Sequence, residues 1–408
     1  MKKKKHRLEW LVNNIKNLKK MDYFLLIVIL IMSIFGTIAI LSATSATSML
    51  TYHVPSSHFF IRQLLWIGLG LVAGLLLFLA PKGLNILYGI GGLILFGGLL
   101  MVVFASGKIS GGAASWIRVQ GGNLQPSEFI KPCMIVFMAS YYDILAKFEA
   151  RISKLNQFKI NALYYIPLGI AVILFLLIFK QPDMGSAFIL FSIACLSFIC
   201  IPYVTKNFKK IAAPLLLLGF ALAFILIGFK DTILSEEQLS RLNFLNPCAR
   251  YYDTGSQVCN SLIAISNGGL FGVGPGNSTQ KFLYLSQCHT DFIFPIIIEE
   301  CGAITGFIII LAYGFILTRI YKIARKADNT YDKIIAYGTL WYLTLHIIIN
   351  ILGVMALMPV TGVPLPFLSY GGSFMLNAFV LIFLTEKVNA NNKVRSLKKD
   401  ILRMTKSR

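Results

Sequence analysis

The residues with the clearest chemical potential lie at 285–302, in the stretch LSQCHTDFIFPIIIEECG. His289 and Asp291 stand directly before an apolar run, and Glu299 and Glu300 lie inside it. A carboxylate at the mouth of an apolar helix is costly unless it is solvated, paired or used. Asp291 is therefore a candidate general base, whereas the deeper glutamates are expected to pair inside a helix bundle. A structural interpretation is that Thr290 caps the helix and Asp291 lies in its first turn.

A second group of charged residues lies at 111–132, in GGAASWIRVQGGNLQPSEFIKP. Arg118 and Lys131 offer cations to an anionic ligand. Glu128 and Lys131 are three residues apart and share one helical face, so an internal ion pair explains them equally well. In QPDMGS, at 181–186, Asp183 precedes another apolar run, where the helix dipole alone favours a carboxylate.

A third group belongs to the long polar segment 230–290, which contains Arg241, Gln257, Gln280 and Lys281. Its glycine-rich turn at 268–276 would let the backbone approach a ligand and point N–H groups at phosphate. No GK[ST] follows, so the turn is not a P-loop. A fourth group, PVTGVPLPFLSYGGS at 359–373, predicts a stiff apolar loop that carries Ser369 and Tyr370 as further candidates for substrate contact.

Seven cysteines occur without a CxxC spacing, which argues against a zinc site. Cys248 and Cys259 lie in the long polar segment, and oxidising surroundings would allow them to form a disulfide.

Membrane helices must position these groups. The chain has 408 residues, of which 56% are hydrophobic and 13% charged, and a mean hydropathy of +0.72. A soluble protein of this length needs far more polar surface. Apolar runs long enough for a core of about 30 Å predict an all-α polytopic fold with ten transmembrane helices, at roughly 22–42, 60–80, 84–105, 127–147, 161–180, 184–202, 211–229, 291–319, 333–357 and 372–387. The fourth contains Glu128, Lys131 and Asp143, so it must face other helices or a wet cavity.

Charge asymmetry predicts the orientation. Most of the 38 Lys and Arg residues fall in the two tails and in alternating loops, which places both termini in the cytoplasm. The net charge of +21 therefore has a membrane explanation, and we expect no nucleic-acid partner. The domain prediction is a basic tail at 1–21, a membrane domain at 22–387 with a large external loop at 230–290, and a basic tail at 388–408. Within that loop, 260–274 is too short to span and is interpreted as re-entrant or interfacial.

All four groups then lie on the outer side of the membrane. Each alone has a structural explanation, but together they suggest a site for an anionic headgroup whose apolar tail lodges among the helices. A lipid-linked substrate fits this pattern.

The same motifs carry a family resemblance. FFIRQLLWIGLGLVAG, GGAASWIRV with QPSEFIK, QPDMGSA, RLNFLNP, GSQVCNSLIAISNGGLFGVGPGNSTQKFLYL, HTDFIF with EE, and GVPLPFLSYGGS occur in an order that resembles the FtsW/RodA (SEDS) family over all ten expected spans. GNSTQKFLYL is similar to the division branch, which includes a sporulation paralogue. The resemblance implies a peptidoglycan glycosyltransferase of the bacterial cytoplasmic membrane that polymerises lipid II on the outer face and releases undecaprenyl pyrophosphate. The partners it implies are a class B penicillin-binding protein and other divisome membrane proteins.

The family's essential aspartate corresponds to Asp291. We expect Asp291 to act as the base of an inverting transfer, or to bind a Mg²⁺ or Mn²⁺ that neutralises the pyrophosphate. Arg118, Lys131 and Arg241 are candidates for the pyrophosphate clamp. Gln257, Gln280, Lys281, His289, Ser369 and Tyr370 are the other candidate substrate-binding residues, and Glu128, Asp183, Glu299 and Glu300 are supporting. The alternatives are a flippase or transporter of the lipid-linked precursor and a scaffold for a partner enzyme; service in division or in sporulation stays open.

Overall fold

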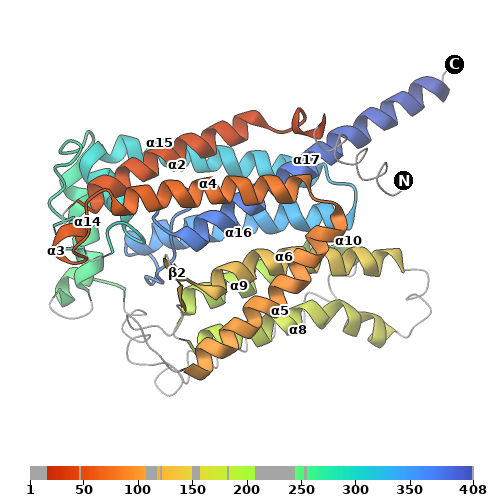
Figure 1. Cartoon of the computed structure of the whole chain (residues 1–408), viewed down its shortest axis with the longest axis horizontal. Coiled ribbons are helices and arrows are strands. Elements are labelled where there is room, and N and C mark those ends of the chain that lie inside the picture. Colours follow the sequence, from red (N-terminus) through yellow and green to blue (C-terminus); the bar gives the residue numbers. More distant parts are fainter. Residues whose placement is uncertain are drawn as a thin grey trace.

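Long apolar runs become helices because a helix satisfies its own backbone hydrogen bonds, which lipid cannot do. The computed structural model describes residues 16–45, 47–106, 117–119, 122–148, 157–181, 183–206, 244–251, 255–282, 284–285 and 287–406 (Figure 1). Within these ranges, eight helices are long and apolar enough to cross a membrane. They are α2 (Tyr23–Ala43), α4 (His58–Leu79), α5 (Lys82–Ser106), α6 (Pro126–Lys147), α8 (Gln157–Phe179), α15 (Ile293–Arg325), α16 (Thr330–Val354) and α17 (Gly372–Lys406).

These eight helices confirm eight of the expected spans. The span expected at 184–202 is the shorter α9 (Met184–Ile199), which is followed by α10 (Pro202–Lys206). The span expected at 211–229 lies outside the described residues. The last helix differs from expectation, because α17 continues through much of the segment 388–408, which the sequence had suggested only as a basic tail.

The helices form one bundle in which α16 has a central position. It packs against α6, α9, α15 and α17, while α2 packs on α15 and α4 packs on α17. In Figure 1, α2, α4, α15, α16 and α17 lie above α5, α6, α8 and α9. Nearly the whole of α6 is buried, including Glu128, Lys131 and Asp143. This confirms that the most polar span faces other helices.

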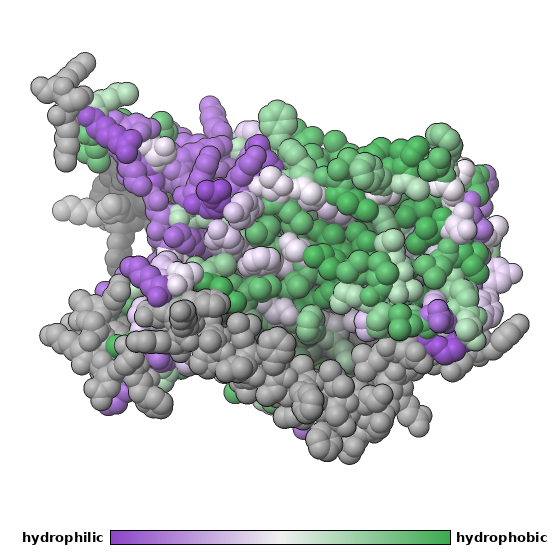
Figure 2. Space-filling view, turned by 180° about the vertical axis from the view of Figure 1, so that it is seen from behind, coloured by the Kyte–Doolittle hydropathy of each residue, from purple (hydrophilic) through white to green (hydrophobic). Residues whose placement is uncertain are grey.

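The outer surface fits a membrane. Figure 2 shows a broad apolar face, with hydrophilic residues gathered mainly toward the end where the termini lie. Many of the exposed side chains are large and apolar, such as Phe24, Ile31 and Leu76. Apolar side chains exposed in such numbers would be unfavourable in water and are satisfied by lipid.

The two ends of the bundle have different structures. The start of α2, nearest the N-terminus, and the end of α17, nearest the C-terminus, lie at one end, called here the terminal end, whereas the short α3 (Thr47–Leu50) and α14 (Ser256–Gly268) lie at the opposite end (Figure 1). At the terminal end, Arg319 pairs with Asp22 at 2.5 Å, and the Asp22 amide donates to Glu386 at 2.7 Å. These contacts fasten the start of α2 to α15 and α17.

Two small elements complete the described structure. Strands β1 (Ile117–Val119) and β2 (Gly122–Leu124) form an antiparallel hairpin in which Arg118 is paired with Asn123. The 3₁₀ turn η1 (Pro247–Arg250) precedes α14.

Candidate active site

Asp291 lies in a turn immediately before α15 and is partly exposed. The helix begins at Ile293, and its N-cap is Phe292, which makes no side-chain cap. The expected capping role of Thr290 is therefore wrong: its hydroxyl donates to the Gln287 side chain at 3.0 Å. Because neither Thr290 nor Asp291 is inside the helix, Asp291 lies just before the start of α15 rather than within its first turn.

A glycine lets the proline-rich loop approach this carboxylate. Gly362 has a φ of +71°, and a Cβ built on it would lie 3.5 Å from Asp291 Oδ2. A Cβ at this distance would be in ordinary van der Waals contact with the carboxylate, but a side chain here would be strained by the backbone conformation. The expected rigid loop at 359–373 thus forms one wall beside Asp291.

Asn350 of α16 holds the two segments together. Its Nδ2 donates to the backbone oxygens of Asp291 and Val363, at 2.7 Å each. Its Oδ1 is buried and has no hydrogen-bond partner among the described residues. Asn350 therefore fixes the backbone of Asp291 against the proline-rich loop and keeps one acceptor available.

His289 lies in an aromatic enclosure. Its ring centroid is 5.0 Å from that of Phe59 and 5.7 Å from that of Tyr370, and its backbone oxygen accepts from the Tyr370 amide at 2.8 Å. Burial lowers the pKa of His289 to about 4. The imidazole is therefore neutral at pH 7, so it contributes aromatic packing rather than charge to the site.

Glu128 and Lys131 form the internal ion pair that was one of the two sequence interpretations. Lys131 Nζ lies 2.6 Å from Glu128 Oε1 and 3.4 Å from His346 Nε2, and its side chain is fully buried. Ser186 of α9 donates to the same Glu128 oxygen at 3.3 Å. The second oxygen, Glu128 Oε2, is buried without a hydrogen-bond partner among the described residues.

Asp183 is the N-cap of α9 and also a tether. It accepts from the Ser186 amide at 3.1 Å, from Gln125 Nε2 at 2.7 Å and from the Ser127 hydroxyl at 3.1 Å. The starts of α6 and α9 are thereby cross-linked by hydrogen bonds from each helix to the other. This geometry supports the structural interpretation of Asp183.

Lys281 is also paired internally. Its Nζ lies 2.9 Å from Glu300 Oε1 and donates to the Gly276 backbone oxygen at 2.6 Å. Ser42 of α2 donates to Glu300 at 2.7 Å. Glu300 therefore pairs inside the bundle, as expected, and its partner is one of the residues that the sequence suggested for substrate binding.

Glu299 organises the glycine-rich segment through hydrogen bonds from neutral groups. It accepts from Asn267, from the Ser278 hydroxyl, and from both the amide and the hydroxyl of Thr279. The Gln280 amide also donates to it, at 3.3 Å. Gln280 is thus placed by its backbone in this internal network.

The glycine-rich turn packs into a break in α15. Gly302 has a φ of +84°, and the helix is non-helical there. The amides of Val273 and Gly274 donate to the backbone oxygens of Glu299 and Glu300 at 2.9 and 3.0 Å. In the reverse direction, the amide of Ala303 donates to Gly269 at 2.9 Å. The turn satisfies the groups that the break frees, so its glycines serve backbone contact rather than a phosphate cradle.

The remaining candidates are Ser369, Tyr370, Gln257, Arg118 and Arg241. Ser369 is fully buried, and its hydroxyl accepts from the Leu365 amide at 2.7 Å. Tyr370 packs against His289, and burial raises the pKa of its phenol. Gln257 is exposed on α14, and Arg118 belongs to β1. Arg241 lies outside the described residues.

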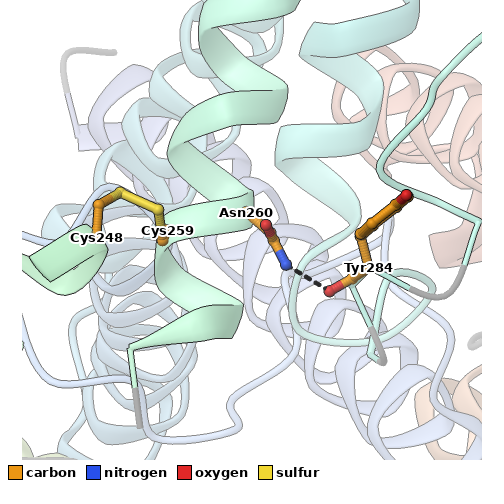
Figure 3. Close-up of a disulfide and its surroundings, with 4 residues drawn as sticks. All are labelled: Cys248, Cys259, Asn260 and Tyr284. Atoms are coloured by element: carbon orange, nitrogen blue, oxygen red, sulfur yellow. Dashed lines mark hydrogen bonds between the residues drawn. A yellow bond between two sulfur atoms is a disulfide. The ribbon is translucent and has the colours of Figure 1, made fainter. Parts of the chain in front are cut away.

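A disulfide joins Cys248 of η1 to Cys259 of α14 (Figure 3). The next residue, Asn260, donates to the Tyr284 backbone oxygen at 2.7 Å. Gly255 allows the close approach, since a Cβ there would lie 2.1 Å from the Pro247 oxygen. The large loop is therefore fastened both to itself and to the segment that leads to Asp291.

Sequence reasoning singled out Asp291 but not the roles of two amides, one that holds its backbone and one that holds the loop beside it. Asn350 and Gln63 act through backbone groups distant in the chain: Gln63 Nε2 donates to the Ser369 oxygen at 3.1 Å. The one signal available was that each is an amide in an apolar span, where an amide needs a partner. Within the described residues, no three His, Cys, Asp or Glu side chains gather to hold a metal ion.

Comparison with known proteins agrees with this architecture. The family model described as Cell cycle protein, which groups FtsW, RodA and SpoVE, matches residues 22–394. The probable peptidoglycan glycosyltransferase FtsW of Bacillus subtilis is 35% identical over 369 residues, covering 88% of each chain. Stage V sporulation protein E of the same organism is 34% identical, over 86% of this chain and 92% of its own.

Two solved structures share the fold. A chain from a peptidoglycan synthase complex that coordinates polymerization and crosslinking matches with a TM-score of 0.69 at 20% identity, over 91% of this chain and 98% of its own. The rod shape determining protein RodA of Thermus thermophilus matches with a TM-score of 0.59 at 24% identity, over 90% and 96%.

Proposed function

The chain belongs to the cell cycle protein family of FtsW, RodA and SpoVE, and we propose that it is a peptidoglycan glycosyltransferase that polymerises lipid II during cell division. It is a multi-pass bacterial membrane protein. The observation that carries the proposal is the likeness to the FtsW of Bacillus subtilis, at 35% identity over 88% of the chain. The likeness to a sporulation protein at 34% is nearly as high, so the division role is the finer part of the proposal.

The geometry around Asp291 supports a lipid-linked substrate. The carboxylate is partly exposed and precedes α15 at the end of that helix opposite Arg319, which pairs with Asp22. Figure 2 shows a broad apolar face along the helices. A substrate whose polar headgroup lies at Asp291 would therefore have its apolar tail in contact with this apolar face. A soluble sugar donor has no use for this arrangement.

In the reaction we propose, the 4-hydroxyl of an acceptor N-acetylglucosamine attacks C1 of a donor N-acetylmuramic acid. Asp291 takes the hydroxyl proton as the new C1–O bond forms. The bond from C1 to the pyrophosphate oxygen breaks, and undecaprenyl pyrophosphate leaves with its electron pair. One displacement inverts the anomeric centre, so a single base is sufficient.

The other candidates have positioning or charge roles in this proposal. Arg118 and Arg241 form the pyrophosphate clamp. Lys131 is neutralised by Glu128 inside the bundle, and Asn350 fixes the Asp291 backbone. Lys281, Gln280 and Ser369 hold the loops through internal contacts.

A divalent cation is a further part of the proposal. Magnesium is commonly held by one or two carboxylates together with substrate phosphates, and it keeps several waters. Asp291, as a single partly exposed carboxylate, fits that pattern of binding to Mg²⁺ or Mn²⁺. Such an ion would supply charge neutralisation at the pyrophosphate.

We also propose ten spans, with both termini in the cytoplasm and the loop at 230–290 outside. The Cys248–Cys259 disulfide supports this orientation, because disulfides persist in oxidising compartments. On this orientation Asp291 faces the outer surface, where a class B penicillin-binding protein would crosslink the strands. That transpeptidase and other divisome membrane proteins are the partners we propose.

The test is polymerisation by the purified full-length chain, with lipid II as substrate and gel separation of glycan strands. Reactions with and without a co-purified class B penicillin-binding protein, and with and without Mg²⁺ or Mn²⁺, separate the partner and cation proposals from the enzymatic one. Strands under at least one condition support the proposal. Movement of lipid II across proteoliposomes without any polymerisation would replace it with a flippase function.

A further inference from the structure

The last helix carries a feature that the glycosyltransferase site does not use. From Lys393 to Lys406, α17 presents apolar residues at 394, 397, 401 and 404, a spacing of three and four. This is the a/d pattern of a coiled-coil seam, which is narrower than the face of a core helix. Leu397, Ile401 and Met404 are 55%, 60% and 69% exposed. We call Val394, Leu397, Ile401 and Met404 the α17 stripe.

Three contacts hold this part of α17 upright on the bundle. Asn392 donates to the Ile323 oxygen at 3.1 Å, Arg395 pairs with Asp332 at 2.9 Å, and Lys399 pairs with Asp328 at 2.8 Å. Residues 395 and 399 lie on the helical face opposite the stripe. The helix therefore uses its basic face on its own chain and turns its apolar face away.

The stripe stands clear of the lipid. Lys393 donates to the backbone oxygen of Lys20, just before α2 begins at Tyr23. With a rise of 1.5 Å per residue, Met404 lies about 16 Å beyond Lys393 along the axis. Figure 1 shows α17 continuing past the other helices toward the C-terminus. A helix that binds a membrane surface lies in the plane of the interface, so this geometry favours a protein occupant over lipid.

The charges beside the α17 stripe indicate what kind of protein could bind it. Between Lys393 and Lys406 there are six Lys and Arg residues and one acidic residue, Asp400. In a parallel pairing with a second copy, Lys393 would face Lys398 of the other chain, which is repulsive. An occupant with acidic residues beside its own apolar seam avoids this repulsion.

We propose that the α17 stripe docks an acidic amphipathic helix of a partner protein, on the side of the membrane where both termini lie. The seam provides apolar burial, and Lys393 and Lys398 select acidic flanking positions. The bundle contacts of Arg395 and Lys399 fix the direction in which the stripe faces.

A binding measurement on the full-length chain in neutral phosphatidylcholine nanodiscs tests this. The probe is a fluorescent three-heptad peptide with Leu at a and d and Glu at e and g, and its counterpart has Lys at e and g. We expect the acidic peptide to bind and the Lys peptide not to bind. L397S/I401S and K398E should each weaken binding of the acidic peptide by about tenfold or more in Kd, equivalent to about 1.4 kcal/mol. L402S is the matched control, because Leu402 is 62% exposed but lies off the stripe.

Equal binding of both peptides, no binding of either, or an equal effect of L402S would overturn the proposal. In cells, a photo-crosslinking residue at position 401 should give an adduct with an acidic helical segment of another protein, whereas one at position 402 should not. Adducts at position 401 only with lipid, with residues 1–20 of this chain or with a second copy would also overturn it.

Discussion

At the scale of single residues, the site depends on how a few polar groups are held rather than on how many there are. Asp291 is fixed through its backbone by Asn350 and approached by Gly362. His289, two residues earlier, is fixed by aromatic packing. Asp291 and His289 could be singled out as candidates from the sequence because their motif stands at the start of an apolar run. Their supports could not, because Asn350 is 59 residues from Asp291.

His289 predicts a specific acid sensitivity. Its folded-state pKa is about 4, below the ordinary 6.5, so the unfolded chain gains a proton before the folded one does. Its contribution to stability is complete above pH 6.5 and is lost as the pH falls from 6.5 toward 4, at up to about 1.4 kcal/mol per pH unit. Thermal unfolding in detergent between pH 7.5 and 5 should show a smaller acid-induced decrease in Tm for His289→Phe than for the native chain. Identical pH dependence in both would contradict the burial argument.

Asn350→Asp should reduce catalysis while leaving substrate affinity almost unchanged. The new carboxylate faces two carbonyl oxygens at the positions where the amide donated, so the backbone of Asp291 shifts. A loss of about 2.7 kcal/mol in the transition state corresponds to about a 100-fold lower kcat. The measurement is lipid II polymerisation with kcat and KM determined separately. Asn392→Asp is the control, since Asn392 makes a comparable hydrogen bond to the Ile323 oxygen at the opposite end of the bundle. An equal loss of kcat in Asn392→Asp would contradict the role assigned to Asn350.

At the scale of elements, the sequence predicted where helices lie but not where one of them breaks. Hydropathy located α2, α4, α5, α6, α8, α15, α16 and α17, because lipid demands long apolar helices. Gly302, however, lies within a run that reads as continuous helix. The break depends on the turn at 269–274, which supplies hydrogen bonds from another part of the chain. Such a partnership leaves no local pattern, and the glycines that form it resemble a phosphate-binding turn.

Gly302→Ala should therefore destabilise the protein strongly. Its φ of +84° is unfavourable for alanine, and the new Cβ would lie 2.2 Å from the Leu270 oxygen. We expect a loss of at least about 2 kcal/mol of stability, from backbone strain and the displaced turn. Gly314→Ala in the same helix meets nothing within 4 Å and should be neutral or slightly stabilising. Thermal unfolding of both variants in detergent tests this, and similar Tm values for the two would show that the break is not required.

At the scale of the whole molecule, the proposal needs a particular sidedness. The disulfide joins η1 to α14, and α14 lies at the end of the bundle opposite the start of α2 and the end of α17 (Figure 1). Asp291 is on the α14 side as well, since Asn260 of α14 donates to the segment that leads to it. Charge distribution and the disulfide support the same orientation by independent physics, one through membrane insertion and one through redox chemistry.

Labelling of intact cells with a membrane-impermeant maleimide measures this sidedness. Cys248 and Cys259 should react only after a reductant is added, and the Cys248→Ser/Cys259→Ser variant should show no such increase. Labelling of both cysteines without a reductant would exclude the disulfide in cells. Failure to label them even after reduction would contradict the external position of the loop.

The most direct test of the central claim is polymerisation of lipid II by Asp291→Asn, with Asp328→Asn as the control. Asparagine keeps the size of the side chain and removes the base, whereas Asp328 lies in the short connection between α15 and α16, at the end where the termini lie. Both purified variants should keep the Tm of the native chain. We predict that Asp328→Asn forms glycan strands at the native rate and that Asp291→Asn forms none. Native-like strand synthesis by Asp291→Asn would contradict the assignment of Asp291 as the catalytic base.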